Sequence, residues 1–483
     1  MNKVSISIQY SKSMDLILNL RESILFIEDL DNPLLNLGKP TKENIKRIGN
    51  LKVRKGSIGA IFNILIFVPY TLMNVVINCI HHYKYIDHLK ALKKPIDKSD
   101  YLFLSHYVGQ RFNDKSDLFF GNTPWLVSDN GKKSIVLCIN HKKRLEKDSN
   151  ILSSTLMPKT CMSKYRFQLI LRSVNKSLTY FWHGVSYLIK NSEKANHLFL
   201  LSQIQTKLSS FNTEILLSNL ILFVSRIQPT HLVVTLEGHP YESRIANALA
   251  KKNFKATVIY WQVAPVVSKQ HGFLETIEKL PPNSKVATSG DITKRYIESN
   301  ISGFQQVFLI GSPKYKEVDL LKRPRNAILL APEGSTEAVL EFMEFIPGLC
   351  KKLPNRKVIL RLHPAVAKLK LRNNSFDLLN ISNFVLSDNS LQDDLVKSEF
   401  CIFRSSSVGI EALSYSVKPI HFSEFRNGEI NPLALLEPWA LEAQNISQLI
   451  GIIEKNSNLN DEFLQDRYQL NYSEFNLQKF LAL

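Results

Sequence analysis

The residues best suited to chemistry occur in short polar segments that each follow an apolar run. The first, at 237–242, contains Glu237, His239 and Glu242. A carboxylate or imidazole here can act as general base on an acceptor hydroxyl, and a carboxylate can act as nucleophile in a two-step transfer. Gly238 lets the chain turn tightly and bring the Glu237 carboxylate close to a ligand. We predict catalysis by Glu237 first, then by His239 or Glu242; alternatively, Glu242 faces solvent on the following helix.

A second polar segment ends the apolar run at 357–364 and contains Arg361, His363 and Pro364. A histidine at the carboxyl end of a strand can donate a hydrogen bond to a phosphate oxygen. When protonated, it also offsets the negative charge that develops on a departing nucleotide. The alternative is a histidine in a surface loop without a ligand. We predict a donor-binding role for all three residues.

A third segment, Arg404 to Ser407, consists of an arginine and the serines Ser405, Ser406 and Ser407, and it leads into a helix that carries Glu411. Serine hydroxyls beside the free amides of a helix N-terminus favour a phosphate. A plain serine N-cap is the alternative. Two glycine turns that follow strands are weaker candidates for phosphate contacts, because such turns are also frequent without a ligand. They contain Gly311 with Ser312 and Gly334 with Ser335.

Two series of strands are expected to position these segments. Apolar runs alternate with helical patterns, as in parallel sheets covered on both faces. The expected strands lie at 24–27, 101–109, 134–141, 231–238, 256–263, 285–290 and 306–313, and then at 326–334, 357–364, 384–388, 400–407 and 417–422. Residues 164–225 and the last 45 are expected to be largely helical. We predict an α/β fold with an acceptor half at 1–315, a donor half at 316–440 and a helical segment at 441–483. Ligands of such sheets bind at the carboxyl ends of the strands.

Residues 56–80 run for 25 positions without a charge, which is long enough for a helix to cross a bilayer. Asn63, Pro69, Asn74 and Asn78 lower the apolarity of this segment. A helix in the membrane interface, a true span and a buried core helix therefore all stay open. In the first two cases the basic stretch at 39–55 would lie on anionic headgroups. We expect a cytoplasmic protein that is peripheral or interfacial at the inner membrane.

Composition narrows the partners. The chain has 61 basic and 43 acidic residues, a net charge of +18, which points to polyanions or an anionic membrane face. No nucleic-acid-binding module is recognisable, so nucleic acid is not an expected partner. The five cysteines lack zinc-ligand spacing and indicate a reduced compartment. A P-loop, a G-x-G-x-x-G motif and a D-x-D at a suitable strand end are also missing, so no metal and no cofactor is expected.

Together, LEG at 236–238, HP at 363–364 and SSS at 405–407 resemble, in type and order, the motifs of GT-B glycosyltransferases that use CMP-activated acidic sugars. These are bacterial sialyltransferases, polysialyltransferases and β-Kdo transferases. The segments FLSHYVG and SDLFFGNTPWLVSDNGKK also look like surface-carbohydrate biosynthesis proteins of this type. The sialyltransferase motif is usually an acidic residue followed by aspartate and glycine, whereas this chain has Leu236 before Glu237 and Gly238.

The resemblance implies a GT-B fold, with two Rossmann-like domains facing a central cleft. By it, His363 and the serines would hold the phosphate of CMP, Glu411 would contact the nucleotide, and Glu237 would be the catalytic carboxylate. The substrates would be a nucleotide sugar, such as CMP-Kdo, and a glycan or lipid-linked glycan acceptor. A glycerol-phosphate transferase with a CDP-linked donor, a UDP-sugar transferase and a non-catalytic glycan assembly factor are the alternatives.

Overall fold

The computed structural model describes the greater part of the chain from Lys98 onward. The described residues are 98–107, 116–140, 155–158, 217, 220–221, 223–238, 240–267, 271–302, 306–315, 318, 325–333, 336–363, 378–404, 406–422, 431–455 and 459–483. Segment 56–80, the basic stretch 39–55, the expected strand at 24–27 and most of the region 164–225 lie outside these residues. Within the described part of the chain, no helix has both the length and the apolarity to cross a membrane.

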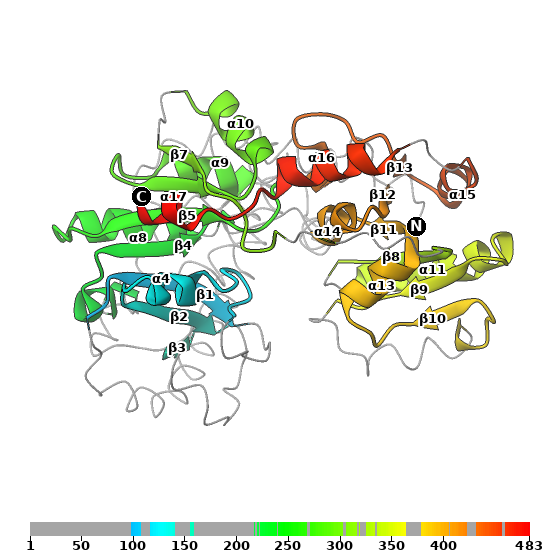
Figure 1. The fold of residues 1–483 in the computed structure, drawn as a ribbon, viewed down its shortest axis with the longest axis horizontal. Helices are drawn as coiled ribbons and strands as arrows, with labels where there is room; N and C mark the ends of the chain where they lie inside the picture. The colour runs from blue at the N-terminus through cyan, green and yellow to red at the C-terminus, as the bar shows by residue number, and fades with distance from the viewer. Residues whose placement is uncertain are drawn as a thin grey trace, which may run out of the picture. The chain divides into compact units, whose positions relative to one another are not determined.

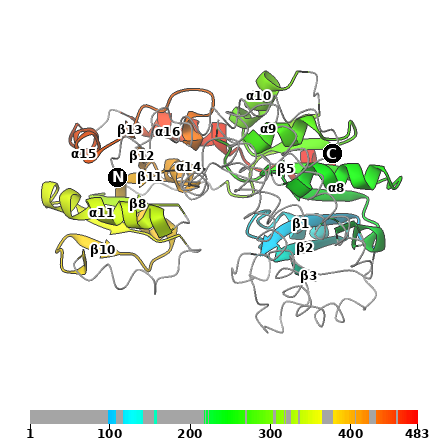
Figure 2. The same ribbon diagram turned by 180° about the vertical axis from the view of Figure 1, so that it is seen from behind.

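The first sheet contains seven strands within the described residues, all in one sheet with the order β3-β2-β1-β4-β5-β6-β7. The pairs that join β1, β2, β3, β4 and β5 are parallel. Its strands are β1 (Tyr101–Tyr107), β2 (Ser134–Asn140), β3 (Thr155–Pro158), β4 (His231–Thr235), β5 (Thr257–Gln262), β6 (Lys285–Thr288) and β7 (Val307–Leu309). The helices of this part are α4 (Thr123–Asp129), α8 (Pro240–Ala250), α9 (His271–Glu278) and α10 (Asp291–Asn300). Figures 1 and 2 show β1, β2 and β3 following one another on one side of this sheet.

The second sheet has the order β10-β9-β8-β11-β12-β13, with every pair parallel. Its strands are β8 (Ala327–Ala331), β9 (Lys357–Leu360), β10 (Phe384–Leu386), β11 (Ser398–Phe403), β12 (Lys418–Phe422) and β13 (Glu442–Ala443). The helices are α11 (Thr336–Lys352), α13 (Leu391–Lys397), α14 (Val408–Ser414), the 3-10 turn η4 (Pro432–Ala434), α15 (Ile446–Glu454), α16 (Asp461–Asn471) and α17 (Leu477–Leu481). Both strand orders are Rossmann-like.

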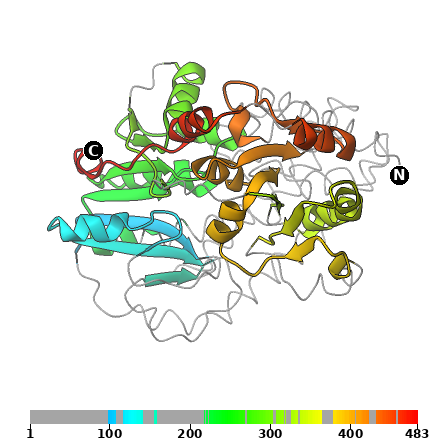
Figure 3. The same cartoon turned by 45° about the vertical axis from the view of Figure 1, so that its right-hand side comes forward.

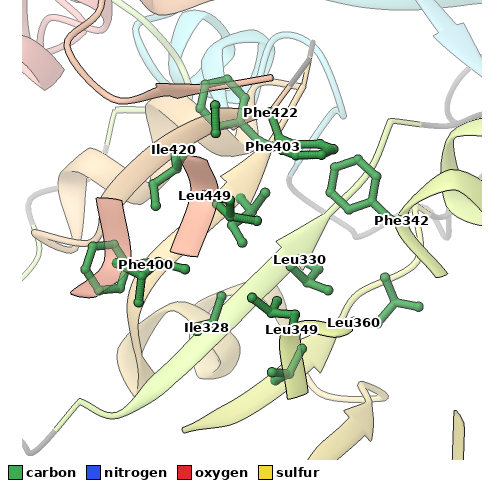
Figure 4. Packing of buried hydrophobic residues seen from close by; sticks show 14 of the residues in the cluster. Ile328, Leu330, Phe342, Leu349, Leu360, Phe400, Phe403, Ile420, Phe422 and Leu449 are labelled. Carbon is green, nitrogen blue, oxygen red and sulfur yellow. The ribbon is translucent and has the colours of Figure 1, made fainter. Parts of the chain in front are cut away.

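Apolar runs without alternation form the central strands because both faces of the second sheet are covered. One cluster joins Ile328, Leu330 and Phe400 to Phe342 and Leu349 of α11 (Figure 4). A smaller cluster joins Leu329 and Cys401 to Leu395 of α13. Successive residues of one strand thus enter different clusters, as the two-residue period of a strand requires.

The chain divides into two compact units. The described residues up to Trp261, residues 271–286 and Leu483 form the first, and residues 262–270 and 287–482 form the second. The second unit therefore includes the end of β6, α10 and β7 together with the C-terminal segment. Figure 3 shows α16, in red, beside α10, in green.

Two glycines of the second unit make room for this C-terminal segment. A Cβ atom at Gly290 would lie 2.1 Å from the carbonyl oxygen of Asn471, and one at Gly311 would lie 2.1 Å from that of Glu474. The backbone amide of Ser312 donates to the carbonyl of Ser473 at 2.8 Å, and the amide of Ser473 donates to that of Ser289 at 2.8 Å. The ends of β6 and β7 are thus joined to the segment by backbone hydrogen bonds.

These strand orders confirm the predicted fold class, α/β with two Rossmann-like sheets. Proteins of the GT-B class contain two such sheets in one chain. Each expected strand from residue 101 onward is present, usually shorter at its carboxyl end than its apolar run. The C-terminal 45 residues contain the helices α15, α16 and α17 together with the short strand β13. The sequence analysis missed β3 and β13, which are short strands at the two sheets' edges.

Candidate functional site

Each sheet has a point at which its strand order reverses. In the first sheet this topological switch point lies between β1 and β4, and in the second it lies between β8 and β11. In α/β proteins, ligands bind outside the carboxyl ends of the strands at such a switch point. The side chains that follow these four strands are therefore the first to consider.

At the second switch point, Arg404 follows β11 and Glu333 follows β8. The Arg404 Nε donates to the two carboxylate oxygens of Glu333 at 2.8 and 2.9 Å, and one terminal nitrogen also contacts that carboxylate. The other terminal nitrogen donates to Glu341 of α11 at 2.7 Å. Only 5% of Arg404 is exposed. A buried guanidinium is thus compensated by two carboxylates.

His363 follows β9, the strand next to β8, and therefore stands at the same edge of the second sheet. It is an exposed residue, yet the protein around its ring lowers its pKa, and the negative charge of Glu333 opposes that shift. With a pKa below its ordinary value, His363 is mainly neutral near pH 7. A phosphate bound beside it would favour the protonated form.

The serines Ser406 and Ser407 lead from β11 into α14. The Ser407 hydroxyl donates to the carboxylate of Glu411 at 3.0 Å, and the amide of Val408 donates to the Ser406 hydroxyl at 3.3 Å. A Cβ atom at Gly409 would lie 2.5 Å from the ring of Phe403, so the start of α14 packs closely on β11. The two hydroxyls lie at the start of α14, where the amides of Gly409 and Ile410 donate to the carbonyls of Ser406 and Ser407.

Three predicted donor-binding residues have structural contacts. Arg361 donates to the buried carboxylate of Asp394 at 3.0 Å and to the carbonyl of Asn389 at 2.6 Å. Gly311 and Ser312 make the close approach to the C-terminal segment described above. Their roles in donor binding stay predictions.

Five other predicted residues lie outside the described residues, namely His239, Gly334, Ser335, Pro364 and Ser405. Across the described part of the chain, there is no group of three or more His, Cys, Asp or Glu side chains that could hold a metal ion.

At the first switch point, His106 of β1 and Thr235 of β4 meet. The His106 Nε2 lies 2.9 Å from the Thr235 hydroxyl and 3.0 Å from the hydroxyl of Tyr241 in α8. Burial raises the pKa of Tyr241 well above its usual range, with further contributions from the charges of Glu242 and Glu237. Tyr241 is therefore a neutral phenol with its proton in place.

The two predicted carboxylates of this segment differ in their surroundings. Glu242 is fully buried, and its carboxylate accepts hydrogen bonds from the backbone amides of Glu237, at 3.0 and 3.2 Å, and of Gly238, at 2.8 Å. Glu242 thus holds the turn after β4, in which Gly238 has a φ of +80°. Glu237 is partly exposed at this turn. Of the two, Glu237 is the better placed to reach a substrate.

The sequence analysis did not select His106, Tyr241, Glu333 or Glu341 as site residues. The first three lie near the ends of strands that flank a switch point, or begin the next helix, but selecting them requires the strand order, which the sequence analysis did not give. Glu341 gave no such signal, because it lies inside α11.

No family model and no curated protein matches the sequence. Among solved structures, a UDP-GlcNAc 2-epimerase from Methanocaldococcus jannaschii has a TM-score of 0.49 at 11% identity, over 79% of this chain and 98% of its own. A TarM variant from S. aureus has 0.47 at 10%, over 80% and 98%. The wall teichoic acid polymerase TagF has 0.41 at 12%, over 87% and 96%. These scores lie below 0.5, so the fold assignment rests on the strand orders alone.

Proposed function

We propose that the chain is a glycosyltransferase of the GT-B class that transfers a sugar from a nucleotide-activated donor to a glycan or glycolipid acceptor. The observation that carries the proposal is the second switch point, where Arg404, Glu333, His363 and two serines follow parallel strands at one edge. This edge is where Rossmann-like sheets bind nucleotides.

The donor half, 316–440, would hold the phosphate through His363, Ser406 and Ser407. A helix N-terminus and a histidine that becomes protonated on binding supply positive potential without a metal ion. Glu411 orients Ser407 through the 3.0 Å hydrogen bond. Further donor contacts are proposed for Gly311, Ser312, Gly334, Ser335, Arg361, Pro364 and Ser405.

The acceptor half, 1–315, would supply the base. Glu237 takes the proton from the acceptor hydroxyl as that oxygen bonds to the sugar carbon and the bond from the sugar to the nucleotide phosphate breaks. The leaving phosphate keeps the electron pair of that bond, and His363 offsets its charge. The segment 441–483 contains the short strand β13 and the helices α15, α16 and α17, and all of it except Leu483 belongs to the second unit.

We further propose a CMP-linked acidic sugar, such as Kdo, as donor, on the basis of the LEG, HP and SSS motifs. The net charge of +18 and the uncharged stretch at 56–80 support a peripheral place at the cytoplasmic face of the inner membrane, with a surface glycan as product.

Donor turnover tests the proposal. Release of nucleotide from CMP-Kdo, CMP-sialic acid, UDP-GlcNAc and CDP-glycerol would be measured, with water as acceptor, for the wild type, Glu237→Gln and the control Glu278→Gln, an exposed carboxylate of the first unit. We expect the wild type to release CMP, and Glu237→Gln to release it at least about 100-fold more slowly. The Glu278→Gln control should release CMP at the wild-type rate, and EDTA should not change the rate of release. A Glu237→Gln protein as active as the wild type would sink the catalytic assignment. No release from any donor would sink the transferase.

A further inference from the structure

A network of three buried polar side chains lies at the switch point of the first sheet. His106, Thr235 and Tyr241 are 3%, 0% and 5% exposed. The His106 Nε2 is within 3.0 Å of both hydroxyls. Burying three polar groups costs free energy unless they form hydrogen bonds with one another. The geometry of this network is therefore more constrained than that of an apolar contact.

The network joins three elements around one turn. His106 belongs to β1, Thr235 is the last residue of β4, and Tyr241 is in the first turn of α8. The Nε2 of His106 carries either a proton or a lone pair, so it can donate to one of the two hydroxyls or accept from one of them. In either tautomer it bonds the end of β4 or the start of α8, and its ring lies between the two hydroxyls.

The turn between Thr235 and Tyr241 is the one that carries Glu237. Glu242, the residue after Tyr241, accepts the amides of Glu237 and Gly238. The Tyr260 hydroxyl donates to the backbone carbonyl of Glu242 at 2.5 Å. Hydrogen bonds therefore hold the backbone on both sides of Glu237. In the network, His106 is the residue that belongs to β1.

We propose that His106 is a positioning residue, which acts through Tyr241 and Thr235 to fix the turn that presents Glu237. The catalytic meaning of this position rests on the proposed function, while the mechanical claim does not. Loss of the imidazole would leave two buried hydroxyls with one partner fewer and loosen residues 235–242. A displacement of about 1 Å in a reacting group can reduce turnover roughly 100-fold.

The test compares His106→Leu, which removes the nitrogen, with His106→Gln. The glutamine amide stands as many bonds from Cα as Nε2 does, so it can reach the same hydroxyls. Tyr241→Phe removes the phenol oxygen. His231→Leu is the matched control. His231 is the first residue of β4, at the amino-terminal end of the parallel strands and away from the turn, and its ring stacks on Tyr101 with centroids 4.5 Å apart.

Hydrogen exchange of residues 235–242, measured by mass spectrometry on the full chain, decides the mechanical claim. We expect faster exchange in His106→Leu and Tyr241→Phe, a wild-type rate in His106→Gln, and no change in this segment for His231→Leu. Wild-type exchange in His106→Leu, or equal acceleration in His106→Gln, overturns the proposal.

Turnover of CMP-Kdo or CMP-sialic acid decides the catalytic meaning. We expect kcat to fall roughly 10- to 100-fold in His106→Leu, with KM for the donor unchanged, most of kcat restored by His106→Gln, and no additional loss in the double variant with Tyr241→Phe. An unchanged kcat, or a loss confined to KM, overturns this part. If the wild type turns over no donor but the exchange pattern holds, the proposed function fails and the positioning role stands.

Discussion

Arg404 and Glu333 are joined across the reversal of strand order in the second sheet, with the Arg404 Nε 2.8 and 2.9 Å from the two oxygens of the Glu333 carboxylate. Arg404 also donates to Glu341, so much of its planar donor fork is engaged within the protein. We therefore interpret Arg404 as the residue that fixes the end of β8 beside that of β11. The phosphate of a donor would be met by His363 and the serines.

Replacement of Arg404 is the first prediction. Arg404→Met removes the charge between Glu333 and Glu341, whose side chains are 21% and 25% exposed. We expect the free energy of unfolding to fall by about 3 kcal/mol, because two partly buried carboxylates lose their partner. Denaturant melts would measure it. Arg295→Met is the control, since its pair with Asp291 is exposed and the expected loss is below about 0.5 kcal/mol. Equal losses in the two variants would contradict the account.

The glycines that face the C-terminal segment give the second prediction. Gly290→Ala and Gly311→Ala would each place a Cβ atom 2.1 Å from a backbone oxygen, which nothing short of a backbone shift can relieve. Each is expected to lower stability by more than about 2 kcal/mol. Gly348→Ala is the matched control, because no atom lies within 4 Å of its added Cβ, and alanine is expected to stabilise α11 by about 0.5–1 kcal/mol. Thermal melts of the three variants compare them, and tolerance of alanine at Gly290 or Gly311 would show that the segment is not held there.

Proton uptake at His363 is the third prediction. Partial desolvation by the surrounding protein lowers the pKa of the His363 ring in the free protein, so the ring is mainly neutral near pH 7. A bound phosphate raises that pKa, and affinity for nucleotide is therefore expected to fall as pH rises through the value in the complex. Calorimetry in buffers of different ionisation enthalpy measures the protons taken up. His363→Gln should take up fewer. If His363→Gln took up as many protons as the wild type on binding nucleotide, another group would be the one that gains the proton.

Much of this arrangement could be predicted from the sequence, and the reasons are specific. Apolar runs such as KVIL and FCIF indicated strands, because strands buried on both faces need no alternation. Residues after them, such as His363 and Arg404, could be selected because ligands bind at carboxyl ends. Which side chains form hydrogen bonds and ion pairs with one another could not be predicted. That Arg404 binds Glu333, or that the Glu242 carboxylate serves a turn, depends on strand order and side-chain direction, which a linear pattern does not contain.

The short edge strands show the same limit. β13 contains only Glu442 and Ala443, and it exists because His421 and Phe422 of β12 offer it a parallel partner. Glu442 and Ala443 do not form an apolar run that would indicate a strand. Similarly, the role of His106 depends on β1 and β4 being neighbours, although 129 positions separate His106 from Thr235.

The buried thiols provide a fourth prediction. Burial raises the pKa of Cys138 to about 12 and that of Cys350 to about 11, and it raises the pKa of Cys401 as well. The thiolate is the reactive form, so these three cysteines are expected to resist iodoacetamide in the native protein at mildly alkaline pH. Peptide mass spectrometry, with a guanidinium-unfolded sample as control, reads each site separately. Rapid native labelling of Cys401 would show that the core around β11 opens readily.

The central claim is that the second switch point binds the nucleotide of the donor, and the most direct test is the thermal shift of the full chain with CMP, CDP, UMP, UDP and GDP. We predict that CMP or CDP raises the melting temperature of the wild type, that His363→Ala and Ser406→Ala lose this response, and that Glu237→Gln keeps it. No shift with any nucleotide, or an equal shift in His363→Ala and Ser406→Ala, would contradict the account.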